Sequence, residues 1–285
     1  MKAGVSLYSF HKYSANDSLG MKGCIEKAKS LTQGAADIAV ASPMYIGIAN
    51  VIDSLIVVKQ FVFDEKIITM QELINALHCN WQGYEDLHTL IINKGDFFGN
   101  DTERSNYVAQ RLYKSLYEFL RDKKNVFGLH WLVGDLLGYN IHHKWFGEKT
   151  LATPDGRYSG DMLKFGLGQS EGRDRNGLSA LLNSVAKVDP NAIGCGSTVT
   201  NFMIDEQLIK NDSNFEKTVD MLETYFKMGG VHFQLTYVSK EDLLNAKVTP
   251  EDYKNLRVRV TGFSDYFVKL NEAIQDDIIA RTEQK

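Results

Sequence analysis

A glycine close to the C-terminal end of the chain stands in a pattern that points to chemistry. In the stretch RVRVTGFSDYF, residues 257–267, two valines alternate with two arginines, and Gly262 follows. Such alternation predicts a short half-buried strand. The ordinary explanation for the glycine is a turn that requires a positive φ angle, which glycine adopts without steric penalty.

The other residues with reactive or metal-binding side chains are scattered. Cys24, Cys79 and Cys195 are too few and too far apart for a disulfide framework or a paired-cysteine metal site, which is typical of a protein in a reducing compartment. His142 and His143 are adjacent but lack a third histidine in register. We therefore expect a structural or surface role for this pair and assign no metal.

Length and composition limit the class of protein. The chain has 285 residues, 44% of them apolar, which is enough for a substantial core. Its net charge is −4 and it has no long basic run, so we expect neither nucleic acid nor a membrane surface as a partner. The N-terminus lacks a continuous apolar segment, and charges at Asp53 and Lys59 interrupt the most apolar stretch, so we expect a cytoplasmic protein without a membrane span.

The elements that must position these residues alternate between helices and strands. Capping-box spacing occurs at Thr69 with Glu72 and at Ser213 with Glu216, and Pro250 stands at an expected first helical position. The pattern predicts helices at 21–32, 50–63, 70–79, 102–123, 175–186, 214–227, 240–247 and 271–282, and strands at 197–204, 231–238 and 256–260. Alternation of this kind favours an α/β fold with parallel strands and helical crossovers.

One of these strands has an unusual polar face. In VHFQLTYV, the side chains of His232, Gln234 and Thr236 share one face of the strand. Parallel strands are normally apolar on both faces. Two interpretations are equally good: the polar face lines the lumen of a barrel and meets a polar substrate, or the strand is an edge strand with one solvated face.

The stretch RVRVTGFSDYF, followed by VKLNEAIQDDIIARTE, closely resembles the signature of glycyl radical enzymes. TPDGRYSGDML, GQSEGRDRNGLSALLNSVAKVD and GGVHFQLTYVSKEDLLNAKVTPEDYKNL resemble further segments of this family, in family order. The resemblance covers nearly the whole chain, is strongest from Thr153 onward, and is closer to the dehydratase, decarboxylase and C–X lyase branch than to the pyruvate formate-lyase branch.

The resemblance implies a fold and a role for Gly262. The expected fold is the second half of an α/β barrel with helices outside, ending in the glycyl radical loop and a C-terminal helix. Residues 1–150 would form its helix-rich part and 151–285 the C-terminal strands and radical domain, within one structural unit. Gly262 would store the radical, because a Cα radical flattens and glycine has no Cβ to obstruct this. Thr198, Thr200, His232, Gln234 and Thr236 are the candidate pocket wall.

The resemblance also implies partners. In the family a radical SAM activating enzyme installs the radical, so the chain itself is expected to bind no cofactor. The radical then passes to a cysteine thiol, whose thiyl form abstracts hydrogen from a small substrate. Cys24, in GCIE, is a candidate for that cysteine, but its surroundings predict a helix, so we favour a packing role for it.

Three functions follow from this resemblance. The chain is first expected to be the radical-bearing part of a lyase or dehydratase, completed by another chain with the catalytic cysteine. The alternatives are an accessory protein that restores a damaged glycyl radical enzyme, or a formate acetyltransferase-like activity. The length of chain before the glycine loop favours the first of these.

Overall fold

The computed structural model describes residues 45–124, 142–164, 166–188, 200–204, 212–260, 263–281 and 283–284. The helices are α3 (Ile48–Val57), the π-helix η2 (Val58–Asp64), α4 (Met70–His78), α5 (Glu85–Lys94), α6 (Glu103–Arg121), α7 (His142–Glu148), α8 (Gly177–Ala186), α10 (Asp212–Lys227), α11 (Lys240–Val248), the short 3₁₀ helices η4 (Pro250–Tyr253) and η5 (Phe267–Lys269), and α12 (Glu272–Ala280). The strands are β1 (Asn201–Ile204), β2 (Gln234–Tyr237), β3 (Arg257–Arg259), β4 (Ser264–Tyr266) and β5 (Glu283–Gln284).

The described strands form two small sheets. One is a parallel sheet in the order β2-β1-β5, and the other is the antiparallel hairpin β3-β4. Parallel strands separated by helices confirm the α/β class that the alternation predicted. The barrel expected from the family resemblance is not seen, because the parallel sheet has three strands within the described part of the chain.

Local sequence signals account for several of these elements. At the start of α4 the Thr69 hydroxyl accepts the backbone N–H of Glu72 and the Glu72 carboxylate accepts the backbone N–H of Thr69, which confirms the predicted capping box. Pro250 opens η4, as predicted. The capping box predicted at Ser213 is wrong, because α10 begins at Asp212 and Ser213 therefore lies inside its first turn.

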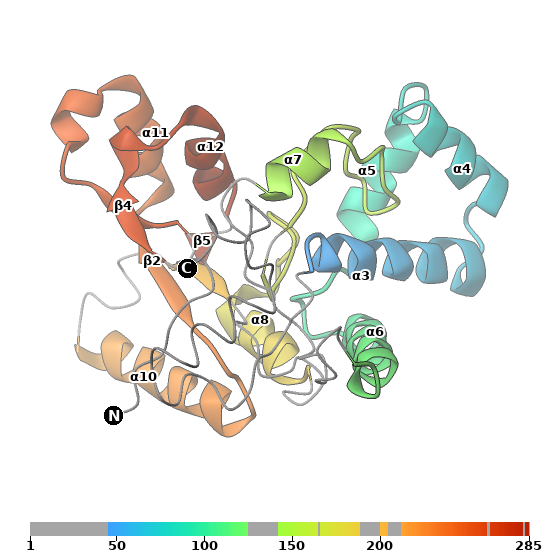
Figure 1. Cartoon of the computed structure of the whole chain (residues 1–285), viewed down its shortest axis with the longest axis horizontal. Coiled ribbons are helices and arrows are strands. Elements are labelled where there is room, and N and C mark those ends of the chain that lie inside the picture. The colour runs from blue at the N-terminus through green and yellow to red at the C-terminus, as the bar shows by residue number, and fades with distance from the viewer. Residues whose placement is uncertain are drawn as a thin grey trace, which may run out of the picture.

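Three apolar cores hold the described elements together. The first joins α3, α6, α8, α10 and β1, and the second joins the end of α3 and η2 to α4 and α5. The third, which we call the C-terminal core, consists of Met203, Val238, Leu243, Ala246, Val258, Val260, Phe267 and Ile278. Figure 1 shows α11, α12 and the hairpin gathered in one lobe, with β2 running from that lobe toward α10. We call this lobe, residues 239–284, the C-terminal module.

The parallel sheet lies between the first core and the C-terminal core. Phe202 and Ile204 of β1 belong to the first core, whereas Met203, on the opposite face, belongs to the C-terminal core. Every residue of β1 is accordingly buried. The sheet therefore connects the helical body of the chain to the hairpin that carries the glycine motif.

Candidate functional site

The hairpin of β3 and β4 brings the two sides of the glycine motif together. Its antiparallel register pairs Arg257 with Tyr266, Val258 with Asp265 and Arg259 with Ser264. Beyond the last pair, the Val260 N–H donates to the Phe263 carbonyl at 3.0 Å. The two residues that connect this pair, 261 and 262, lie outside the described residues. A two-residue hairpin connection favours glycine because it requires positive φ angles.

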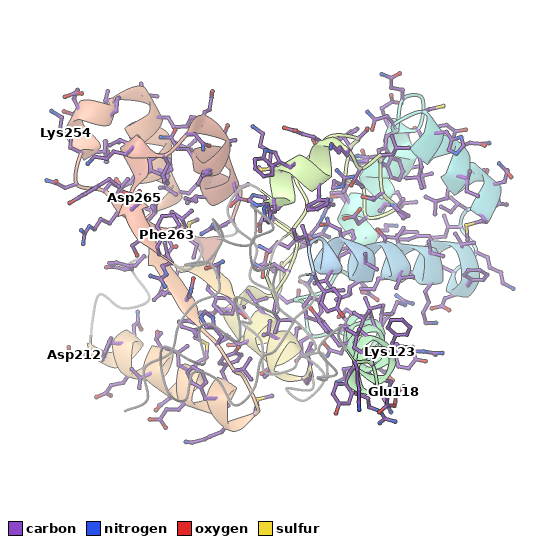
Figure 2. The ribbon with its side chains drawn as sticks, viewed as in Figure 1. Glu118, Lys123, Asp212, Lys254, Phe263 and Asp265 are labelled. Carbon is purple, nitrogen blue, oxygen red and sulfur yellow. The ribbon has the colours of Figure 1, made fainter. Side chains whose placement is uncertain are left out.

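One side of the hairpin is sheltered and the other is open. Val258 and Val260 are each only 2% exposed and belong to the C-terminal core, which confirms the alternation predicted for this strand. Phe263 is 46% exposed. Figure 2 shows Phe263 near β2, at the inner side of the C-terminal module, whereas Lys254 lies on its outer side. The strand that leads to residues 261 and 262 is thus anchored in the core, whereas the residue that follows them is open to solvent.

A buried arginine binds the backbone that leads into the turn. Arg281 directly follows α12, and 3% of it is exposed. Its Nη1 donates to the Arg259 carbonyl at 2.8 Å and its Nη2 to the Val260 carbonyl at 2.8 Å. Nη2 also contacts the Asp277 carboxylate at 3.2 Å, which balances the buried charge. The guanidinium thus links the end of β3 to α12.

The polar face of β2 lies against the same hairpin. The Thr236 hydroxyl donates to the Arg259 carbonyl at 3.4 Å. Gln234 is 9% exposed and Thr236 is 2% exposed, because the C-terminal module covers this face of the sheet. The edge-strand interpretation with a solvated polar face is therefore wrong. The barrel-lumen interpretation stays a prediction.

His232 lies two residues before β2, and its ring is neutral. The Thr200 N–H donates to His232 Nδ1 at 3.3 Å, so the ring proton is on Nε2. Burial lowers the pKa of His232, and the charge of Arg259 lowers it further. Because Nε2–H must donate, we assign the Gln234 amide with its oxygen toward Nε2, at the 3.3 Å contact between these side chains.

Two amides on this face have hydrogen-bonding capacity to spare. Asn201 and Gln234 are partners in the register of β1 and β2, so their side chains project from the same face of the sheet. Both are 9% exposed. Within the described residues, one amide atom of Gln234 and Asn201 Oδ1 have no hydrogen-bond partner. Unpaired buried polar atoms are costly, which makes this point of the sheet a candidate contact for a polar ligand.

The remaining candidate residues are placed as follows. Thr198, Cys24, Cys195 and Gly262 lie outside the described residues. Cys79 follows α4 and is exposed.

The adjacent histidines lie on a helix, α7, that the sequence pattern did not predict. The ring of His142 packs against Trp145, with 5.6 Å between ring centroids. His143 is buried, with Nε2 4.0 Å from Asp277 Oδ1, and burial lowers its pKa. His143 therefore lies beside the acidic partner of Arg281.

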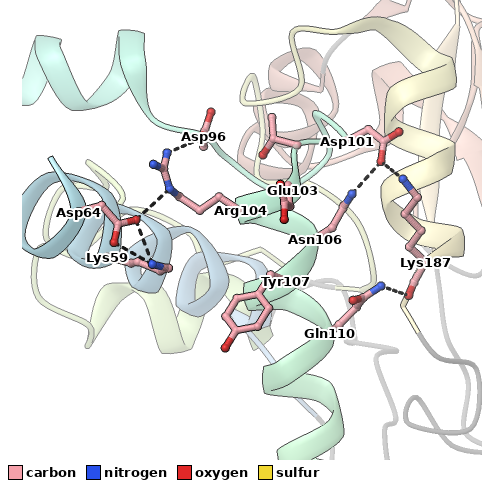
Figure 3. Close-up of a pocket in the computed structure, with 11 residues that line it drawn as sticks. Lys59, Asp64, Asp96, Asp101, Glu103, Arg104, Asn106, Tyr107, Gln110 and Lys187 are labelled. Carbon is pink, nitrogen blue, oxygen red and sulfur yellow. Dashed lines mark hydrogen bonds and ion pairs between the residues drawn. The ribbon is translucent and has the colours of Figure 1, made fainter.

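The largest of the described pockets is polar and lies away from the hairpin. It has a volume of about 830 Å³ and is lined mainly by α6 and the end of η2. Figure 3 shows most of its charges paired: Arg104 lies between Asp64 and Asp96, and Lys187 binds Asp101 at 2.6 Å. None of the candidate site residues lines this pocket.

A second pocket, of about 500 Å³, reaches α12. Asp277 and Ala280 line one side, and the ion pair of Lys164 with Glu171, at 2.6 Å, lines another. Asp277 is also the partner of Arg281, so this pocket ends next to the residue that binds the hairpin.

Sequence reasoning missed the role of Arg281 and Asp277. Their only sequence signal is their position, because they enclose the apolar run Ile278–Ala280 four residues apart, which places them on one side of the helix end. Such a pair is normally read as a surface ion pair. The structure instead buries both.

Two family models match the chain. The Pyruvate formate lyase-like family matches residues 5–133, and the Glycine radical family matches residues 163–268, a span that includes Gly262. The trans-4-hydroxy-L-proline dehydratase of Clostridioides difficile is 35% identical over 92% of this chain and 33% of its own length. The isethionate sulfite-lyase of Oleidesulfovibrio alaskensis is 31% identical over 95% of this chain and 32% of its own length.

Solved structures give the same result. The glycerol-bound B12-independent glycerol dehydratase of Clostridium butyricum superimposes with a TM-score of 0.81 and 36% identity over 92% of this chain and 33% of that one. The hydroxyproline dehydratase of Clostridioides difficile, with trans-4-hydroxy-L-proline bound, gives 0.82 and 35% over the same shares. The chain thus spans about a third of the length of these relatives. It belongs to the glycyl radical enzyme family and carries the family's glycine radical domain.

Proposed function

We propose that this chain is the radical-bearing part of a glycyl radical lyase or dehydratase, and that Gly262 stores the unpaired electron. The observation that carries the proposal is the match to the Glycine radical family across residues 163–268, with Gly262 two positions beyond Val260 in a hairpin closed by the Val260–Phe263 hydrogen bond. A glycine at that point can become planar, since it has no Cβ.

In the proposed reaction a partner activase supplies the oxidising radical. One electron from the activase's iron–sulfur cluster cleaves S-adenosylmethionine into methionine and a 5′-deoxyadenosyl radical. That radical takes a hydrogen atom from the Gly262 Cα, which yields 5′-deoxyadenosine and leaves one electron on the carbon. A cysteine thiol then gives its hydrogen atom to the Gly262 Cα and becomes a thiyl radical. The thiyl radical abstracts a hydrogen atom from the substrate.

We place the thiyl cysteine on a complementary chain. The dehydratases and sulfite-lyases that resemble this chain are about three times as long. Cys79 is exposed next to α4, in the helical part held by the second core, whereas the hairpin belongs to the C-terminal core. Cys24 remains the candidate within this chain.

The polar face of β2 is the proposed C-terminal wall of the substrate pocket. Thr198, Thr200, His232, Gln234 and Thr236 are its candidate residues, and the spare amide atoms of Gln234 and Asn201 are suited to hydroxyl groups of a small polar substrate. Similarity to dehydratases and lyases favours cleavage of a C–O or other C–X bond over formate acetyltransferase-like chemistry. The match over residues 5–133 favours an enzyme part over an accessory protein, which would need little beyond the radical domain.

The test is radical formation on the purified chain. After anaerobic incubation with a cognate activase, S-adenosylmethionine and reductant, electron paramagnetic resonance should show an organic-radical doublet, split by the one hydrogen left on the Gly262 Cα. Gly262→Ala should abolish the doublet, because a methyl group hinders both abstraction and planarity.

A matched control separates this effect from general backbone strain. Gly83, between α4 and α5, has a φ of +78°, and a Cβ there meets no atom within 4 Å. Gly83→Ala therefore adds a strained alanine at the opposite side of the molecule from the hairpin (Figure 1) and should retain the doublet. An unchanged doublet in Gly262→Ala would place the radical elsewhere. Two further assays then separate the enzyme part from the accessory protein. An enzyme part should support substrate turnover when mixed with the complementary chain, whereas an accessory protein should restore activity to an oxygen-damaged relative.

A further inference from the structure

The backbone immediately before the turn is held by three side-chain contacts. Arg281 binds the Arg259 and Val260 carbonyls, each at 2.8 Å, and Thr236 binds the Arg259 carbonyl at 3.4 Å. Arg281 and Thr236 are 3% and 2% exposed. The hydrogen bonds between β3 and β4 pair other backbone groups of the hairpin. The contacts of Arg281 and Thr236 therefore act on the end of β3 in particular.

The geometry of the contact is informative. In an extended strand, successive carbonyls point to opposite sides. A single guanidinium can bind the carbonyls of two consecutive residues only where the chain has left the extended form, and β3 does end at Arg259. The planar fork of arginine fixes both carbonyls at once, which a lysine ammonium, a flexible point charge, cannot do.

The contact lies one peptide unit from the proposed radical. The Val260 carbonyl belongs to the peptide that joins Val260 to Thr261, and the next peptide joins Thr261 to Gly262. Sharing of the unpaired electron requires the Gly262 Cα to be coplanar with its adjacent peptide groups. Fixing the Val260 peptide limits the rotations that bring the Gly262 peptides out of plane.

We propose that Arg281 is a positioning residue for the glycyl radical: it sets the conformation of the turn and so the planarity and lifetime of the radical. Asp277 holds the guanidinium in place from α12, and His143, with Nε2 4.0 Å from Asp277, continues this contact to α7. The proposal rests on Gly262 as the radical site.

The first test uses the unactivated protein, so it does not depend on the radical. Hydrogen–deuterium exchange of the amide of Val260, which bonds to the Phe263 carbonyl, reports opening of the turn. Arg281→Lys keeps the charge beside Asp277 but loses the fork, and we expect this amide to exchange about tenfold faster, since hydrogen bonds to charged groups are among the stronger ones. Thr236→Val, which removes only the longer contact, should have a smaller effect in the same direction.

The second test uses the activated protein. In Arg281→Lys we expect a doublet with altered splitting or more than one component, and an anaerobic radical half-life about tenfold shorter. Ile278→Val is the matched control, because it removes one methyl group from a fully buried residue of the same helix without touching the carbonyls. It should leave both the line shape and the half-life unchanged.

The outcomes separate the two proposals. The positioning role would be overturned if Arg281→Lys had the same amide exchange rate and the same line shape as wild type. It would also be overturned if Ile278→Val changed both to the same extent as Arg281→Lys. If the lysine variant fails to fold, Asp277→Asn, which removes the charge that holds the Arg281 guanidinium, decides by the same exchange measurement. A wild-type chain that gives no doublet refutes the radical assignment of Gly262 and with it the radical part of this inference, whatever the exchange result.

Discussion

Asp53 is a buried carboxyl group in α3 whose ionisation should weaken the fold. It is fully buried, with Oδ1 accepting the Phe98 N–H at 2.8 Å and Oδ2 accepting the Ser170 hydroxyl at 2.7 Å. Burial raises its pKa from 3.8 to about 7, and the nearby Asp155 adds to the shift against the hydrogen bonds from Ser170 and Phe98. A neutral Asp53 is therefore favoured in the folded chain.

The sign of the pH dependence follows from proton binding. Between about pH 4 and pH 7 the folded chain holds a proton on Asp53 that the unfolded chain has lost, so stability falls as pH rises through this window. The difference between a pKa of 3.8 in the unfolded chain and about 7 in the folded chain corresponds to at most about 4 kcal/mol of stability. Asp53→Asn keeps both hydrogen bonds, with its amide donating to the Ser170 hydroxyl, and cannot ionise. At pH 8 it should be more stable than wild type by about 2–4 kcal/mol.

Urea unfolding at pH 4.5, 6 and 8 measures this difference. The fluorescence of Trp81, 1% exposed in the second core, is a suitable signal. The free-energy gap between Asp53→Asn and wild type should open as pH rises. A gap that is constant with pH, or that closes toward pH 8, would refute the conclusion that Asp53 is protonated in the folded chain.

Three further predictions address packing, assembly and the candidate cysteine. Gly147→Ala should destabilise the chain by about 1–3 kcal/mol, because a Cβ there would lie 2.2 Å from the Asp161 carbonyl oxygen; an unchanged urea midpoint would contradict this. The chain alone should self-associate in analytical ultracentrifugation, since Val231 and Tyr237 beside the sheet edge are 47% and 44% exposed, whereas a stable monomer would count against a missing complementary chain. Cys24→Ser should leave turnover of the assembled enzyme intact, and complete loss of turnover with the radical doublet preserved would make Cys24 the thiyl residue.

Elements with strong local signals could be predicted from the sequence. The capping box at Thr69 starts α4, and the alternating valines place β3 with one side in the core. The weaker start of α10 was misplaced because Ser213 is one of several residues that can begin a helix there. No local pattern predicts α7, because its sequence HHKWFGE is polar and short. Its position depends on contacts with distant segments such as Leu163.

The site could be predicted only in part. The proposed radical residue lies in one short stretch of sequence, whereas the residues that hold that stretch in place come from distant parts of the chain. Gly262 stands in a contiguous motif, so resemblance alone pointed to it. The burial of the polar face of β2 depends on the C-terminal module packing over it. Arg281 binds carbonyls about twenty residues away, and carbonyls carry no side-chain signature in a sequence. A contact between residues so far apart in the sequence can be identified only from the folded structure.

Within the described ranges, no helix is long and apolar enough to cross a bilayer.

Cleavage by oxygen tests the central claim most directly. Dioxygen adds to a Cα radical, and the resulting peroxyl species fragments the backbone at that residue. Activated chain that shows a strong doublet should therefore yield, on exposure to air, a large fragment ending around Thr261 and a short tail that includes Phe263 onward and carries the oxidised carbons of Gly262, both identified by mass spectrometry. Chain that has not been activated should stay whole. Fragments with other ends, or an intact chain after exposure of a strongly radical-bearing sample, would contradict the assignment of the radical to Gly262.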